Sequence, residues 1–125
     1  MPWIISKRER KVSEMSQSSD EPSNELDRYE LVLLKRPTSS PPFSDEELEQ
    51  LQARHINRLL EQTRLGNIRV AGPVDEQQDE SLRGMCLYQT GSLDQAREFA
   101  SSDPSVLAGR LEVDVMYFYC PKGSI

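Results

Sequence analysis

His55 is the one histidine of the chain, and it stands among leucines. At about 100° per residue it shares a helical face with Leu48, Leu51 and Leu59. A titratable ring on an apolar stripe is either a core histidine with paired polar atoms or a general acid or base, because an imidazole exchanges protons near neutral pH. His55 is therefore the first candidate catalytic residue.

Asp103 is the candidate partner of His55. A carboxylate beside an imidazole fixes the tautomer of the ring and stabilises its charged form. A simpler role is also open, because Asp103 precedes Pro104, and this pair is typical of the N-cap and first position of a helix. The sequence alone leaves both roles possible.

The expected elements alternate between strands and helices. Because two helices on one face of a sheet can bring the middle of one near the end of the other, His55 and Asp103 can meet in such a fold. The order strand, helix, strand, strand, helix, strand predicts an α+β, ferredoxin-like βαββαβ fold with a four-stranded antiparallel sheet. Strands are expected over residues 29–36, 67–73, 82–90 and 111–120, and helices over 44–65, from Ser92 to about residue 100, and briefly after Asp103.

Two further positions could touch a ligand. Gly72 and Pro73 end the expected second strand, where such a pair usually marks a turn, but a glycine there also lets a ligand approach the backbone.

Cys86 and Cys120 are isolated in apolar runs, so we expect reduced core thiols in a cytoplasmic protein. One histidine and two scattered cysteines form no zinc motif, and no phosphate loop is present, so neither a metal nor a cofactor is expected.

Composition limits the domain organisation and the partners. The 125 residues suffice for one core, and the stretch over residues 13–27 is too polar to bury apolar surface. We therefore expect a disordered N-terminal leader over residues 1–27 and one domain over residues 28–125, with Met15 as an alternative start. The net charge of −6 argues against nucleic-acid binding, and no apolar run is long enough to span a membrane.

The predicted sheet has one face without helices. Strands such as YELVLLKR carry apolar residues on both faces, and a soluble monomer rarely exposes such a surface. We therefore expect a homodimer in which two sheets pack face to face.

Several segments, in this order and spacing, resemble the YCII-related family of small bacterial proteins. They are RHINRLL with its helical histidine, VAGPV at a strand end, RGMCLY, SLDQAREFA and DPSVLAGR. The resemblance covers about residues 29–120. It implies a dimeric α/β barrel of two ferredoxin-like subunits, each with a pocket between helices and sheet.

The resemblance also implies roles for particular residues. It implies that His55 and Asp103 form a catalytic pair and that Gly72, Pro73 and Pro104 lie at the substrate. It also implies a lyase-type, dehydrochlorinating activity. Ser105 is the fourth residue expected at the substrate, and it departs from the aromatic residue usual after the DP motif, which predicts a more open or more polar pocket. The leading hypothesis is a cofactor-independent lyase or isomerase acting on a small molecule, and the alternative is a non-catalytic ligand-binding or regulatory dimer.

Overall fold

The computed structural model describes residues 25–125, so most of the leader predicted over residues 1–27 lies outside the described residues. The first strand begins at Leu26, two residues before the predicted start of the domain at residue 28. A partner distant in sequence accounts for this order, because the Lys122 ammonium lies 2.8 Å from the carboxylate of Glu25. A contact between residues so far apart in the chain leaves no local signal.

The described chain contains four strands and three helices in the predicted order. They are β1 (Leu26–Lys35), α2 (Asp45–Arg64), β2 (Ile68–Pro73), β3 (Leu82–Tyr88), α3 (Leu93–Ser101), α4 (Pro104–Leu107) and β4 (Glu112–Pro121). The strands form one sheet in the order β2-β3-β1-β4, with β3 antiparallel to both β1 and β2. This is the α+β, ferredoxin-like arrangement, so the predicted fold class is confirmed.

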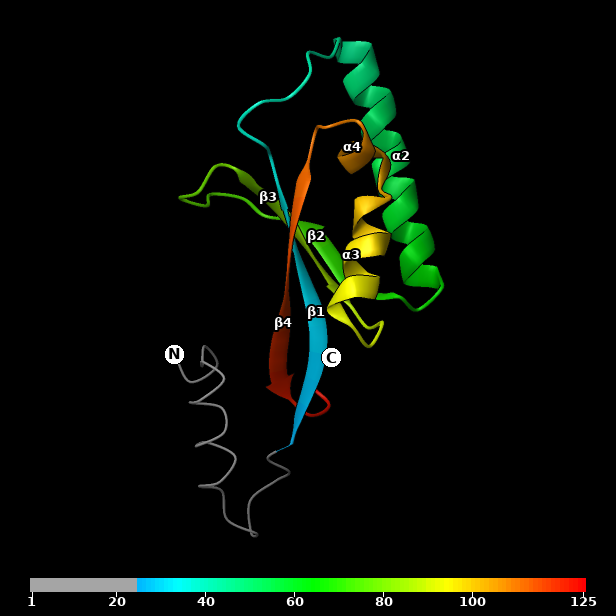
Figure 1. Cartoon of the computed structure of the whole chain (residues 1–125), viewed down its shortest axis with the longest axis vertical. Helices are drawn as coiled ribbons and strands as arrows, with labels where there is room; N and C mark the ends of the chain where they lie inside the picture. Colours follow the sequence, from blue (N-terminus) through cyan, green and yellow to red (C-terminus); the bar gives the residue numbers. More distant parts are fainter. Residues whose placement is uncertain (1–24) are drawn as a thin grey trace. The chain divides into compact units, whose positions relative to one another are not determined.

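The helices and the central part of the sheet belong to one compact unit, Tyr29–Tyr117. Figure 1 shows α2, α3 and α4 on the same side of the strands. Their apolar side chains meet those of the sheet in a single cluster, which excludes water from the inner face of the strands. Its buried members are Val32, Leu34, Ile68, Cys86, Tyr88, Ala96, Ala100 and Val115.

The longest helix, α2, begins and ends at the predicted signals. The Ser44 hydroxyl accepts a hydrogen bond from the Glu47 amide at 3.1 Å, and the Glu47 carboxylate accepts one from the Ser44 amide at 3.0 Å. This reciprocal capping box satisfies two amides that have no partner within the helix. At the other end Gly66 has a φ of 84°, a conformation that glycine adopts without a steric penalty.

Both cysteines are buried free thiols, in agreement with the prediction of core residues. Burial, with a smaller contribution from the charge of Asp103, raises the pKa of Cys86 to about 12. Since the thiolate is the nucleophilic form, Cys86 is inert near neutral pH.

Glu30 is a buried carboxylate that no sequence pattern predicts. It lies on β1 with 1% of its surface exposed. Its Oε1 atom accepts a hydrogen bond from the backbone amide of Thr90 at 2.7 Å and another from the Thr90 hydroxyl. This pair fixes the turn from β3 into α3, and it compensates for the desolvation of the carboxylate.

Within residues 25–125, no helix has both the length and the apolar character needed to cross a bilayer.

The packing of α2 predicts a contrast between two of its leucines. Leu51 is 4% exposed and Leu60 is 62% exposed. We expect Leu51→Ala to lower the free energy of unfolding by about 2–5 kcal/mol, because it leaves a cavity in the core. Leu60→Ala should change it by less than about 0.5 kcal/mol. Urea denaturation of both variants checks this, and equal losses would contradict the burial of one helix face.

Candidate functional site

His55 and Asp103 lie in direct contact although 48 positions separate them. The Nδ1 atom of His55, in the middle of α2, is 2.9 Å from both carboxylate oxygens of Asp103. Both residues are buried, with 8% and 4% of their surfaces exposed. A carboxylate can only accept, so Nδ1 donates a proton to Asp103, and the tautomer that leaves Nε2 unprotonated is the one this contact favours.

Asp103 also caps the short helix α4. Its Oδ2 atom accepts a hydrogen bond from the backbone amide of Ser105 at 2.8 Å, and Pro104 occupies the first helical turn. The contact with His55 and the cap of α4 therefore coexist in one side chain. The cap holds the carboxylate at the position where it meets the imidazole, and the two donors together compensate for its burial.

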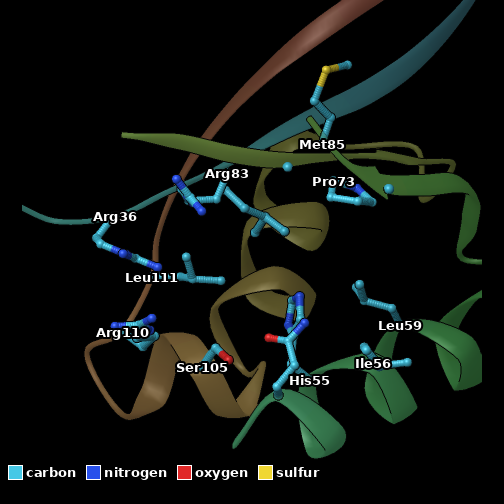
Figure 2. A pocket seen from close by; sticks show the side chains of 14 residues that line it. Arg36, His55, Ile56, Leu59, Pro73, Arg83, Met85, Ser105, Arg110 and Leu111 are labelled. Carbon is cyan, nitrogen blue, oxygen red and sulfur yellow. The ribbon is translucent and has the colours of Figure 1, made fainter. Parts of the chain in front are cut away.

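A cavity of about 320 Å³ lies beside this pair, and His55 is part of its wall. Figure 2 shows the imidazole directed into the cavity, with Ile56 and Leu59 on one side of it and Pro73 on the opposite wall. A volume of this size is at the lower end of the range for small-molecule sites. The wall consists of Leu34, Arg36, Gln52, His55, Ile56, Leu59, Gly72, Pro73, Arg83, Gly84, Met85, Ser105, Arg110 and Leu111.

The structure brings three of the four expected substrate-binding residues to this cavity. Gly72 and Pro73, at the end of β2, line it together with Ser105, which is 3% exposed. Pro104 is absent from the wall and instead begins α4. Asp103 is not part of the cavity wall either; it is buried and contacts Nδ1 of His55.

The glycine that the fold itself requires is Gly84 rather than Gly72. A Cβ atom at Gly72 would meet nothing within 4 Å, whereas one at Gly84 would lie 3.0 Å from the carbonyl oxygen of Gly72. Gly84 pairs with Pro73 across β2 and β3, so a side chain there would push the strands apart at the cavity wall. Gly72 lines the cavity without being sterically constrained, and Gly84, which no sequence pattern singled out, is the glycine that the strand pairing constrains.

Three arginines in the cavity wall were also missed. Arg36 follows the last residue of β1, Arg83 is the second residue of β3, and Arg110 shortly precedes β4. Antiparallel pairing of β1 with β3 places the end of the first strand beside the start of the other, and the amide of Arg36 donates to the carbonyl of Ser81 at 2.7 Å. The available signal in the sequence was a basic residue at the end of β1 and another at the start of β3. This signal can be interpreted only when the pairing of the two strands is known.

Residues 25–125 hold no group of three or more His, Cys, Asp and Glu side chains that could bind a metal ion. The side chains present are of types that can transfer a proton, as an imidazole does, and stabilise negative charge, as guanidinium groups do.

The chain was also compared with known proteins. No curated protein matches the chain. A solved structure, 5-chloro-2-hydroxyhydroquinone dehydrochlorinase from Burkholderia phenoliruptrix AC1100 in complex with 2,5-dihydroxybenzoquinone, is 24% identical and has a TM-score of 0.43. The match covers 70% of this chain and 89% of that chain. The sequence model of the YCII-related domain matches residues 28–119, which include the whole cavity wall, and the chain therefore belongs to the YCII-related domain family.

Proposed function

We propose that the protein is a cofactor-independent enzyme that moves a proton on a small phenolic or carbonyl-bearing molecule, as a lyase or isomerase does. His55 is the general acid and base, and Asp103 is the residue that positions it. One observation carries the proposal: a buried carboxylate holds Nδ1 of a ring that itself lines a cavity. This is the geometry that a histidine needs to present Nε2 to a substrate.

The proposed step follows from the donor and acceptor roles in the pair. With Nδ1–H donated to Asp103, the lone pair of Nε2 takes a proton from the substrate, and the C–H electron pair forms a new double bond. In an elimination the leaving group departs with its bonding electrons, whereas in an isomerisation the imidazolium returns the proton to another atom. The Asp103 carboxylate stabilises the imidazolium in both cases.

The alternative is a binding or regulatory module, in which the same cavity holds a ligand and His55 contributes a hydrogen bond. Ser105 favours this alternative, since a small residue in the wall suits ligand binding without constraining a reacting group. Turnover is the property that separates the two functions, because both require the cavity.

We further propose that the active form is a homodimer joined through the sheet. Val70 on β2 and Met85 on β3 are large apolar residues with 52% and 38% of their surfaces exposed. They line a shallow apolar hollow that also includes Ala71, Val74 and Leu87. A second copy covering this surface would bury about 1,000–2,000 Å² in total, the usual area of a stable interface.

The tautomer of His55 is the first test of the mechanism. We expect two-bond ¹H–¹⁵N NMR spectra at mildly alkaline pH to show a ring protonated at Nδ1, because the Asp103 carboxylate can only accept. In Asp103→Asn, whose amide can donate, the preference for this tautomer should weaken. A wild-type ring protonated at Nε2 would contradict the proposed base.

Catalysis can be tested by NMR in D₂O on a panel of phenols, chlorinated phenols and small ketones, with deuterium incorporation or release of a leaving group as the signal. We expect His55→Gln to lower kcat by about 10²- to 10⁴-fold, the usual contribution of a general base. Asp103→Asn should also lower kcat while keeping α4 capped, because asparagine caps helices as well as aspartate does.

Asp94→Asn is the matched control for Asp103→Asn. Asp94 is an exposed carboxylate in the first turn of α3, 3.9 Å from Arg97. The same chemical change there should leave turnover unaltered. Panel compounds that bind the wild type without any turnover would argue for the binding module.

The dimer can be tested by sedimentation velocity at micromolar concentration. We expect a dimer for the wild type and a monomer for Val70→Glu, because a buried, unpaired carboxylate at the interface is unfavourable. Leu60→Glu places the same charge on an exposed position of α2 and should remain dimeric. A wild-type protein that sediments as a monomer would rule out the proposed assembly.

A further inference from the structure

The cavity wall gathers positive charge in a protein whose net charge is −6. Arg36, Arg83 and Arg110 line it together with His55. In Figure 2 the three arginines lie on one side of the imidazole, whereas Ile56 lies on the other. The cavity therefore has a cationic end and an apolar end.

No acidic side chain within residues 25–125 lines this cavity. Asp103 is already paired with His55, and Glu49 lines an adjoining hollow that shares Arg110. The three arginines affect one another: burial lowers the pKa of the Arg36 guanidinium, and the charges of Arg110 and Arg83 lower it further. Like charges held together in this way are stabilised when an anion binds between them.

Arg36 also has an unused donor. Its Nε atom is buried and has no hydrogen-bond partner among residues 25–125. A buried donor without a partner is costly, and guanidinium groups match the two oxygens of a carboxylate in geometry and charge. An oxyanion at this end of the cavity would offset the excess positive charge through the terminal guanidinium nitrogens, whereas the Nε atom of Arg36 has almost no exposed surface and is not itself within reach of a ligand.

We propose that the cavity binds a small organic oxyanion, with its charged group on Arg36, Arg83 and Arg110 and its apolar body against Leu59 and the neighbouring aliphatic side chains. This inference deepens the proposed function, since it rests on the same cavity, and it places the carbon skeleton of the ligand between the arginines and Nε2 of His55. Anion binding itself requires no turnover, so the two can be tested separately.

The test compares benzoate, phenyl phosphate and the neutral benzamide by isothermal titration calorimetry on the full chain. We expect at least one of the two anions to bind at least 10-fold more tightly than benzamide, because hydrogen bonds to a charged group are stronger than neutral ones. Which anion binds more tightly distinguishes a carboxylate from a phosphate ligand. The affinity for the anion should fall as NaCl is raised from 50 to 500 mM, whereas that for benzamide should not.

Substitutions locate the charge that is responsible. Arg36→Gln and Arg110→Gln should each weaken anion binding by about 10-fold and leave benzamide binding nearly unchanged. Arg97→Gln removes the same charge from an exposed position of α3, outside the cavity wall, and should have no effect. If a variant fails to fold, the salt dependence of the wild type still decides.

The proposal is overturned if neither anion binds at millimolar concentration, if benzamide binds as tightly as both, or if the arginine substitutions have no effect. His55→Gln should keep the preference for the anion while it loses turnover. An anion preference that depends on the arginines, in a protein without any turnover, would support the anion site and contradict only the proposed function.

Discussion

The contact between His55 and Asp103 is the interaction on which the candidate site depends. It joins the middle of α2 to the start of α4, and it places the imidazole between a buried carboxylate and a cavity. Neither partner is stable alone in this position, because a buried carboxylate needs donors and a buried imidazole needs its polar atoms satisfied. The Ser105 amide supplies the second donor, so the cap of α4 and the orientation of His55 are determined together.

The sheet supplies the other half of the site. Antiparallel pairing of β3 with β1 and β2 brings together Arg36 after the end of β1, Arg83 at the start of β3 and Pro73 at the end of β2. Gly84 has no side chain, so β2 and β3 can approach each other at this place. Arg36 and Arg83 reach the cavity for this reason. The Glu30–Thr90 contact stabilises the turn from β3 into α3. The start of α3 and the start of α4 are therefore each stabilised by a buried polar contact in addition to apolar packing.

Membership of the YCII-related domain family fits the ferredoxin-like fold, but a fold can support many functions. The properties that would select a ligand belong to particular side chains of this chain. In the proposed function His55 provides an acid or base; the three arginines provide positive charge, and Ser105 leaves room where a larger residue would narrow the cavity. The choice of ligand therefore depends on the side chains of the cavity wall and not on the sheet that supports them.

The sequence by itself determined the order of the elements, both ends of α2, the N-cap at Asp103 and the candidacy of His55, because capping, turn and periodicity signals act between residues a few positions apart. Only the tertiary structure decided that His55 meets Asp103, that Pro104 is absent from the cavity wall, that Gly84 is the constrained glycine and that Arg36, Arg83 and Arg110 surround one cavity. Those facts depend on strand pairing and helix packing between distant segments, and no local pattern encodes the distance between two side chains 48 positions apart.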